Sequence, residues 1–168
     1  MINETEIRCF RLARMSPLNL GLTLALLALP VAFLIASFLG ARMLTAPGLL
    51  MMVLYAWVWL RLRPKQFIVH QDRLDILWPL KRVQIPRTDI SSVRLISREN
   101  LKNEISRGVR IGAGGLWGGF GWLWTRRRGV IQMYISRTDN FVWIECAGAR
   151  PWLITPEEPE AFVRALSR

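Results

Sequence analysis

The residues best suited to chemistry in this chain lie in one glycine-rich stretch, Gly108 to Gly129 (GVRIGAGGLWGGFGWLWTRRRG). It holds eight of the 12 glycines and three of the eight tryptophans, and a run of three arginines nearly closes it. In membranes, indole rings sit at headgroup level and guanidinium groups bind phosphates. The stretch therefore predicts a loop that dips toward a membrane surface. Its predicted contact residues are Trp117, Phe120, Trp122, Trp124, Arg126, Arg127 and Arg128.

Two other interpretations fit the same stretch. In one, the glycines serve the bulges and corners of a bent hairpin, and the aromatic rings belong to a core. In the other, the stretch is a docking surface for a helix of another membrane protein, because glycine permits close approach and tryptophan and arginine are common anchors. The arginine run alone is also typical of a solvated turn. If it contacts anionic lipid, each arginine adds about 1 kcal/mol of binding free energy.

Residues for catalysis are scarce. His70 is the single histidine, and no metalloprotease, P-loop or nucleophile-elbow motif is present. The glycines are interleaved with tryptophans and lead into arginines, unlike a dinucleotide-binding fingerprint, which leads into a helix. Cys9 and Cys146 have no C-x-x-C spacing, so neither a metal site nor a disulfide framework is predicted. We expect no catalytic residues, no cofactor and no metal.

The elements that must position the glycine-rich stretch begin with two apolar segments. No charged residue occurs in the 27 positions between Arg14 and Arg42, or in the 18 positions from Met43 to Leu60. At ~1.5 Å per residue the first segment crosses a ~30 Å hydrocarbon core, and the second only just spans it. Backbone groups in lipid must be satisfied within their own segment. The pattern therefore predicts a transmembrane hairpin over residues 18–62, with helices at 18–39 and 43–60.

The flanking charges predict how this hairpin is oriented. Six arginines and lysines lie just outside the two predicted helices, and only Arg42 lies in the turn between them. Because cytoplasmic flanks are enriched in these residues, we expect both termini in the cytoplasm, with residues 1–17 as a cytoplasmic segment. The alternative is a cleaved signal peptide over residues 1–40. That alternative fits poorly, because the apolar run far exceeds a signal core of ~7 to 15 residues and a second run follows it.

The net charge of +11 does not by itself indicate nucleic acid. Seven of the 23 basic residues flank the predicted helices, and residues 66–168 carry 16 basic and 10 acidic side chains. This modest surplus suits a domain that lies against the anionic headgroups of an inner leaflet. Nucleic acid is therefore not an expected partner.

Residues 64–168 are long enough for one small domain. Short apolar segments alternate with turn residues in this region, and they predict seven to eight short antiparallel strands in a sandwich or barrel. The polar stretch 97–107 predicts a short helix or a loop. The predicted strands are 67–70, 74–78, 83–85, 90–96, 109–111, 130–135, 141–146 and 152–154.

The end of the chain predicts one capping helix over residues 156–167. Thr155 has the position of an N-cap, Pro156 that of the first helical residue, and Glu158 completes a capping box. Apolar residues then recur at helical spacing, so one face of this helix should pack on the sheets. These residues are Ala161, Phe162, Ala165 and Leu166.

Several segments carry a resemblance to a known family. They are FIVHQDRLDIL from Phe67, residues 83–93, the glycine-aromatic stretch 112–124 and ITPEEPEAFVRAL near the C-terminus. Over residues 64–168 the chain resembles bacterial pleckstrin-homology-like (PH-like) domains, which follow a transmembrane hairpin in many bacterial membrane proteins. The resemblance implies a membrane α-helical hairpin plus a mostly-β PH-like domain, in a bacterial inner membrane. As a class such domains are adapters that bind lipids, peptides or other subunits.

We therefore expect a non-enzymatic, membrane-anchored PH-like binding module, acting as an accessory subunit or assembly and adapter factor of an inner-membrane complex. The alternative is an anionic-lipid-contacting or envelope-stress protein that acts through Trp117 to Arg128. A more distant alternative is a subunit of an oligomeric channel, although the predicted helices hold no carboxylate, histidine or lysine to mark an ion path. The expected partners are the lipid bilayer, a membrane protein or a second copy, and anionic lipid.

Overall fold

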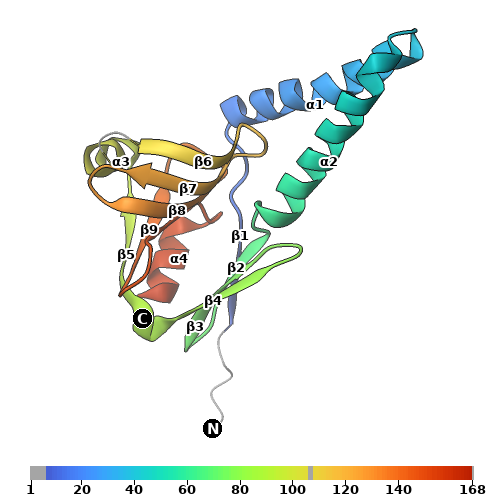
Figure 1. Ribbon diagram of the computed structural model, residues 1–168. Coiled ribbons are helices and arrows are strands. Elements are labelled where there is room, and N and C mark those ends of the chain that lie inside the picture. Colours follow the sequence, from blue (N-terminus) through green and yellow to red (C-terminus); the bar gives the residue numbers. More distant parts are fainter. Residues whose placement is uncertain (1–6, 106–107, 168) are drawn as a thin grey trace.

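The computed structural model describes residues 7–105 and 108–167. A long helical hairpin projects from a domain built of two β-sheets (Figure 1). The hairpin consists of α1 (Pro17–Phe38), the short 3-10 helix η1 (Arg42–Leu44) and α2 (Thr45–Arg61). Both helices are long and apolar enough to cross a membrane by length and composition. Their bounds lie within a few residues of the predicted 18–39 and 43–60.

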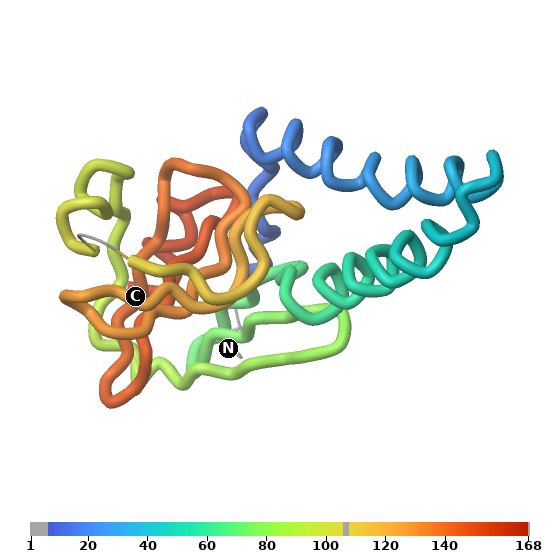
Figure 2. Tube along the Cα trace, turned by 45° about the horizontal axis from the view of Figure 1, so that its top comes forward, coloured from blue at the N-terminus to red at the C-terminus, as the bar shows by residue number. Residues whose placement is uncertain are grey.

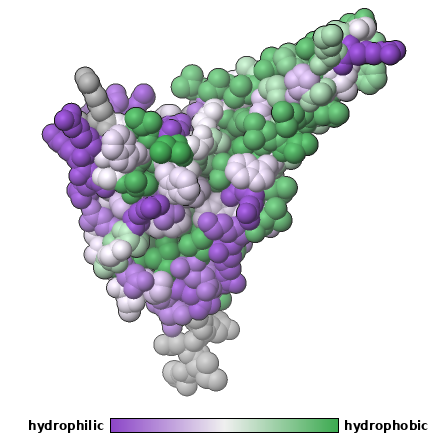
Figure 3. All heavy atoms as spheres, viewed as in Figure 1, coloured by the Kyte–Doolittle hydropathy of each residue, from purple (hydrophilic) through white to green (hydrophobic). Residues whose placement is uncertain are grey.

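The two helices diverge from their connecting turn and are far apart where they meet the domain (Figures 1 and 2). At the start of α1, the Ser16 side chain accepts a hydrogen bond from the Asn19 N–H at 3.4 Å, and Pro17 occupies the first turn. Near the closed end, a Cβ on Gly48 would lie 3.2 Å from the Leu34 side chain, so glycine lets α2 approach α1 there. Hydrophobic surface covers both helices, whereas hydrophilic surface concentrates on the domain (Figure 3).

The smaller sheet has four antiparallel strands in the order β1-β2-β3-β4. One of them, β1, comes from the segment before the hairpin, where no strand was predicted. Arg11 pairs with Gln66, so the chain leaves this sheet before the hairpin and re-enters it afterwards on neighbouring strands. The strands are β1 (Arg8–Arg11), β2 (Gln66–Val69), β3 (Arg73–Leu77) and β4 (Arg82–Pro86), followed by the 3-10 helix η2 (Arg87–Asp89).

The larger sheet has six strands in the order β5-β9-β10-β8-β7-β6. Its pairs are antiparallel except for β10 and β8, which are parallel, so the prediction of an all-antiparallel domain is wrong at this pair. The described residues hold ten strands, more than the seven to eight predicted, because β1 and β7 were not anticipated. The strands are β5 (Ile90–Ile96), β6 (Gly108–Gly114), β7 (Gly119–Thr125), β8 (Gly129–Ile135), β9 (Phe141–Cys146) and β10 (Trp152–Ile154).

The main core lies between the two sheets and α4 (Pro159–Leu166), which contacts β2 of one sheet and β5 and β9 of the other. Fully buried Phe162 of α4 packs edge-on against Phe10 and Phe67, with ring centroids 5.2 and 6.0 Å apart. On the opposite face of the larger sheet, α3 (Arg98–Ile105) covers a second apolar cluster with Leu101 and Ile105. The polar stretch 97–107 thus contains a short helix, one of the two predicted possibilities.

The C-terminal helix begins three residues later than predicted. Instead of capping a helix over 156–167, the Thr155 hydroxyl accepts a hydrogen bond from the Ser136 N–H at 2.9 Å. The Thr155 carbonyl accepts another from the Ala13 N–H, also at 2.9 Å. The hydroxyl and the carbonyl of Thr155 therefore both form tertiary hydrogen bonds instead of capping a helix. The helix starts at Pro159.

We predict that β1 is an integral part of the core. Phe10→Ala should lower the free energy of unfolding by about 3–5 kcal/mol, because it leaves a cavity against Phe162. Cys9→Ala is the matched control on the same strand, since Cys9 is exposed on the other face. Chemical denaturation of both variants in detergent measures the difference. Equal effects of the two substitutions would contradict this assignment.

Candidate functional site

The turn between β6 and β7 lies in the opening of the helical hairpin (Figures 1 and 2). Its residue Leu116 is 8% exposed and packs in one cluster with Tyr55 and Val58 of α2. Leu26 and Leu27 of α1 pack against the same cluster. The turn, residues 115–118, therefore fills the space between the two helices and contacts both of them.

A buried threonine fixes this turn to α1. The Thr23 hydroxyl accepts a hydrogen bond from the Trp117 N–H at 2.9 Å. Its oxygen also lies 2.9 Å from the Gly115 carbonyl and 2.7 Å from the Asn19 carbonyl, to either of which it can donate. Thr23 is only 2% exposed. Although Thr23 lies in an apolar helix, its hydroxyl thus forms hydrogen bonds with the β6–β7 turn of the domain.

The close approach of the turn to α1 requires glycine at position 115. A Cβ on Gly115 would lie 2.8 Å from the Leu22 side chain, and its φ of +93° is one that side-chain-bearing residues rarely adopt. The adjacent Trp117 has a φ of +59°, which is uncommon for a tryptophan. Its ring packs edge-on against Trp59 of α2, with centroids 4.8 Å apart. Arg63 lies 4.2 Å from the centre of the Trp59 ring.

Further hydrogen bonds tie the base of each helix to the domain. The Asn19 side-chain amide donates to the Ser136 carbonyl at 2.9 Å. On the other side, the Trp78 indole N–H donates to the Leu62 carbonyl at 3.0 Å, just after α2 ends. Each helix thus has its own polar attachment to the β-sheets in addition to the shared turn.

The structure distributes the predicted contact residues over four environments. Trp117 lies between the helices, whereas Phe120 is fully buried in the main core and is unavailable for contact with lipid or a partner. Trp122 and Trp124 are 47% and 55% exposed on β7. The arginines, 126–128, form the turn that follows β7. The core interpretation of the stretch thus describes Phe120 but not the two exposed tryptophans.

The two exposed tryptophans form a continuous apolar surface with β6. Trp122 pairs directly with Ile111, and Trp124 pairs with Val109, so all four side chains lie on one face of the hairpin. Ile111 and Val109 are 54% and 59% exposed, and β6 is an edge strand of the sheet. We call these four residues the β6–β7 apolar surface. A surface of this kind is typical of an interaction site.

The arginine turn lies at the opposite end of β7 from the turn in the helical hairpin. At ~3.3 Å per residue, the seven residues of β7 separate the two turns by roughly 23 Å. Arg128 forms ion pairs with Glu145 at 3.1 Å and Glu104 at 3.6 Å. Arg127 donates to the Asn103 carbonyl at 2.9 Å, and Arg126 is exposed. Trp117 and the arginine turn therefore lie at opposite ends of β7, whereas Trp124 lies at the arginine end.

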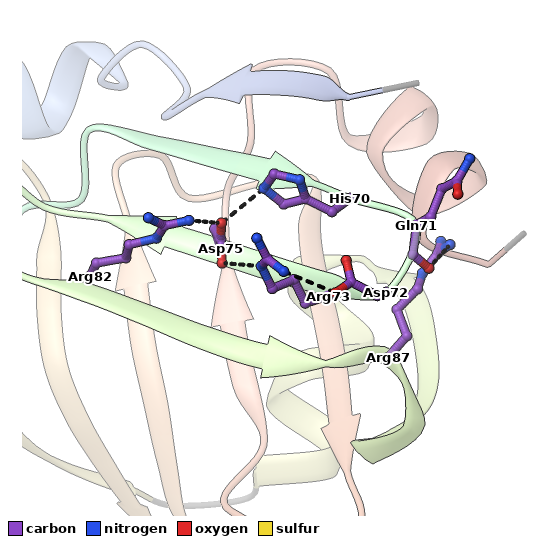
Figure 4. A network of polar contacts seen from close by, with 7 residues as sticks. All are labelled: His70, Gln71, Asp72, Arg73, Asp75, Arg82 and Arg87. Carbon is purple, nitrogen blue, oxygen red and sulfur yellow. Dashed lines mark hydrogen bonds and ion pairs between the residues drawn. The ribbon is translucent and has the colours of Figure 1, made fainter. Parts of the chain in front are cut away.

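A second polar cluster surrounds Asp75 on β3, which is fully buried (Figure 4). The His70 Nε2 lies 2.8 Å and the Arg73 Nε 3.5 Å from its carboxylate oxygens, and Arg82 forms a further ion pair. Burial alone would raise the pKa of the Asp75 carboxyl, but Arg82 and then His70 outweigh it, so the pKa is lowered. The single histidine is thus a partner of a structural carboxylate.

Two further observations concern Cys146 and the metal-ligating residue types. Burial, with a smaller effect from Asp89, raises the pKa of the Cys146 thiol and so disfavours the nucleophilic thiolate. Within residues 7–105 and 108–167, no three histidine, cysteine, aspartate or glutamate side chains gather closely enough to hold a metal ion.

Comparison with known proteins identifies the domain. Residues 65–168, well over half of the chain, match the bacterial PH domain family. The chain belongs to this family. No curated protein and no solved structure matches it in the corresponding comparisons. The family match begins just before β2, so β1 and the helical hairpin lie outside the matched region, although β1 pairs with β2 of the PH domain.

We predict that Asp75 stabilises the PH domain in a pH-dependent way. Because its pKa is lowered on folding, its contribution is complete above the unfolded value of ~3.9 and is lost as the pH falls through the folded value. Asp75→Asn should therefore lower the free energy of unfolding by about 1–3 kcal/mol at pH 7. The difference from wild type should shrink below about pH 4.

Denaturation at several pH values tests this, with Asp72→Asn as the control because the Asp72 side chain is 69% exposed. A loss of stability in Asp75→Asn that stays constant down to pH 3 would show that charge is not the cause.

We also predict that Thr23 couples the hairpin to the domain. Thr23→Val leaves the Trp117 N–H without its partner and should cost about 1–3 kcal/mol of stability. Hydrogen exchange should accelerate at residues 115–118 more than in the strands β8 and β9. Thr88→Val, at an exposed site, is the control. Unchanged exchange at the turn would argue against a coupling role.

Proposed function

We propose that this PH domain protein is a membrane-anchored binding module without catalysis, which serves as an accessory subunit or assembly factor of an inner-membrane protein complex. The observation that carries the proposal is the β6–β7 apolar surface. It presents two half-exposed tryptophans and two exposed aliphatic side chains on one face of a two-stranded hairpin. Such aromatic anchors supply much of the binding energy at protein interfaces.

Membrane insertion of α1 and α2 is part of this proposal. Only 11% and 17% of the most apolar windows of these helices are buried, whereas a core helix of a soluble protein would be mostly buried. Leu50 and Val53 of α2, for example, are 69% and 67% exposed. Exposed apolar surface of this extent is consistent with contact to lipid. Basic residues flank both helices at the ends away from their connecting turn, which supports cytoplasmic termini.

The contacts of α1 also argue against a signal peptide. Thr23 and Asn19 are hydrogen-bonded to the domain, so removal of residues 1–40 would leave the Trp117 N–H and the turn 115–118 without their partners. It would also remove β1 from the smaller sheet. Both helices therefore fit as permanent parts of the folded protein.

The docking of the β6–β7 turn determines where an interaction would take place. Because this turn lies between the bases of the helices, an inserted hairpin would hold the PH domain against the inner leaflet. The β6–β7 apolar surface would then be next to α2, and β6 would offer an unpaired strand edge beside it. A partner membrane protein can use both features, since added strands bind through backbone hydrogen bonds.

Contact with anionic lipid through the arginine turn is the alternative that the geometry favours less. Arg127 and Arg128 already have partners within the domain. The turn also lies at the far end of β7, roughly 23 Å from the residues between the helices. An oligomeric channel or a role in envelope stress has no supporting observation of this kind.

We predict that the full-length protein, expressed at its natural level and purified in lipid nanodiscs, has a native mass that includes a stoichiometric foreign polypeptide. The double variant Val109→Ser, Trp124→Ser should retain at least about tenfold less of this chain, because a buried tryptophan anchor contributes roughly 2 kcal/mol or more. Leu95→Ser is the matched control, since Leu95 is 43% exposed on β5, the other edge strand.

A bare monomer or homo-oligomer in wild type would contradict the proposal. So would equal loss of the foreign chain in the double variant and in Leu95→Ser.

A further inference from the structure

A groove of about 840 Å³ lies between α2 and the β6–β7 hairpin. Ligand pockets typically measure ~300–1,000 Å³, so the groove is large enough for part of a lipid. One wall is the domain-proximal half of α2, including Leu54 and Trp57. The other wall includes Ile111 and Trp122 of the hairpin, and Tyr134 also lines the groove.

Some of the residues that form the hairpin wall are glycines, so part of this wall is bare backbone. Gly112 and Gly121 are cross-strand neighbours that line the groove, with φ values of +144° and +126°. A Cβ on Gly112 would lie 2.2 Å from the Phe120 carbonyl oxygen, and one on Gly121 would lie 2.5 Å from the Ile111 carbonyl oxygen. Larger residues are sterically excluded at both positions. The groove is therefore lined by backbone alone at these two positions.

Two cations line this mainly apolar groove, to which Tyr134 also contributes. Arg61 is the last residue of α2, and Lys81 lies in the turn between β3 and β4; both are exposed and both line the groove. No aspartate or glutamate is among the described residues that line it. A mainly apolar groove whose charged lining residues are both cations favours an amphiphile that has an acyl chain and an anionic headgroup.

We propose that this groove holds an acyl chain of an anionic phospholipid of the inner leaflet, with its phosphate on Arg61 and Lys81. This inference rests on the membrane insertion of α2 proposed above. Leu54 and Trp57 are about half exposed, so the wall of the groove continues onto the surface of α2 that would face hydrocarbon. Arg61 ends the helix, at the depth where basic side chains reach headgroups.

The position of the groove favours a lipid over a protein segment. A partner helix in this space would have to bring an acidic group to headgroup depth, whereas a phospholipid presents its phosphate there already. The bound lipid would contact α2 and the PH domain together and so would add to the attachment made by residues 115–118. The arginine turn is not involved, because it lies at the far end of β7.

The test is native mass spectrometry of the full-length protein, released from nanodiscs made of equal parts phosphatidylglycerol and phosphatidylcholine. Wild type should retain one phosphatidylglycerol in preference to phosphatidylcholine. Lys81→Gln should weaken this retention about fivefold, since one basic residue near the surface contributes ~1 kcal/mol. Leu54→Trp, which adds bulk to the groove, should abolish retention of both lipids. Arg126→Gln, at the exposed arginine turn, should retain lipid as wild type does.

Other results would overturn the inference. Equal retention of the two lipids, no retention in wild type, or an effect of Arg126→Gln as large as that of Lys81→Gln would each do so. If inorganic phosphate displaces the lipid and Leu54→Trp still retains it, the groove is an anion site only and holds no acyl chain. Thermal unfolding of each variant checks that it folds.

The result is separable from that of the partner experiment. Val109 and Trp124 do not line the groove, so their variant tests partner binding alone, and Lys81→Gln tests lipid retention. Failure of lipid retention with an intact partner interaction would leave the proposed function standing.

Discussion

The architecture of this protein depends on one constraint: the helical hairpin is inserted between two paired strands of the same sheet. Arg11 of β1 lies opposite Gln66 of β2, so the chain must leave and re-enter the domain at neighbouring positions. Yet the helices are far apart where they meet the domain (Figure 2). Something must fill the space between them, and the β6–β7 turn does so. Leu116 and Trp117 contact both helices, and Thr23 satisfies the backbone of the turn.

This constraint explains part of the unusual composition of residues 108–129. Different glycines meet different steric demands: Gly115 allows the turn to approach Leu22 of α1, whereas Gly112 and Gly121 allow two strands to approach each other. The aromatic residues divide in the same way. Phe120 completes the core and Trp117 packs on Trp59, while Trp122 and Trp124 remain at the surface. This one stretch of sequence thus docks the domain onto the helices, contributes to the core and forms a candidate interaction surface.

The proposed functions depend on the fixed position of the PH domain relative to the helices rather than on any reactive group. A PH domain tethered by a flexible linker would sample many orientations above a bilayer, whereas this one has attachments to each helix and a shared turn between them. Its β6–β7 apolar surface therefore has a defined position relative to α2. The groove beside that surface has the same fixed geometry. The buried cluster around Asp75 contributes to the stability of the smaller sheet and lies outside these surfaces.

The sequence alone determined the features that depend on local pattern. Charge-free apolar runs gave both helices to within a few residues, alternation gave most strands, and the C-terminal segments pointed to the PH family, whose match covers residues 65–168. Glycines hid β7, because they interrupt the alternation of large residues that marks a strand. Where two structural signals compete for the same residues, only the tertiary structure decided the outcome. Thr155 bonds Ser136 instead of capping a helix, β1 joins a sheet whose other strands lie more than 50 residues away, and the predicted contact residues separate into four environments. These outcomes depend on contacts between distant segments, which no local spacing encodes.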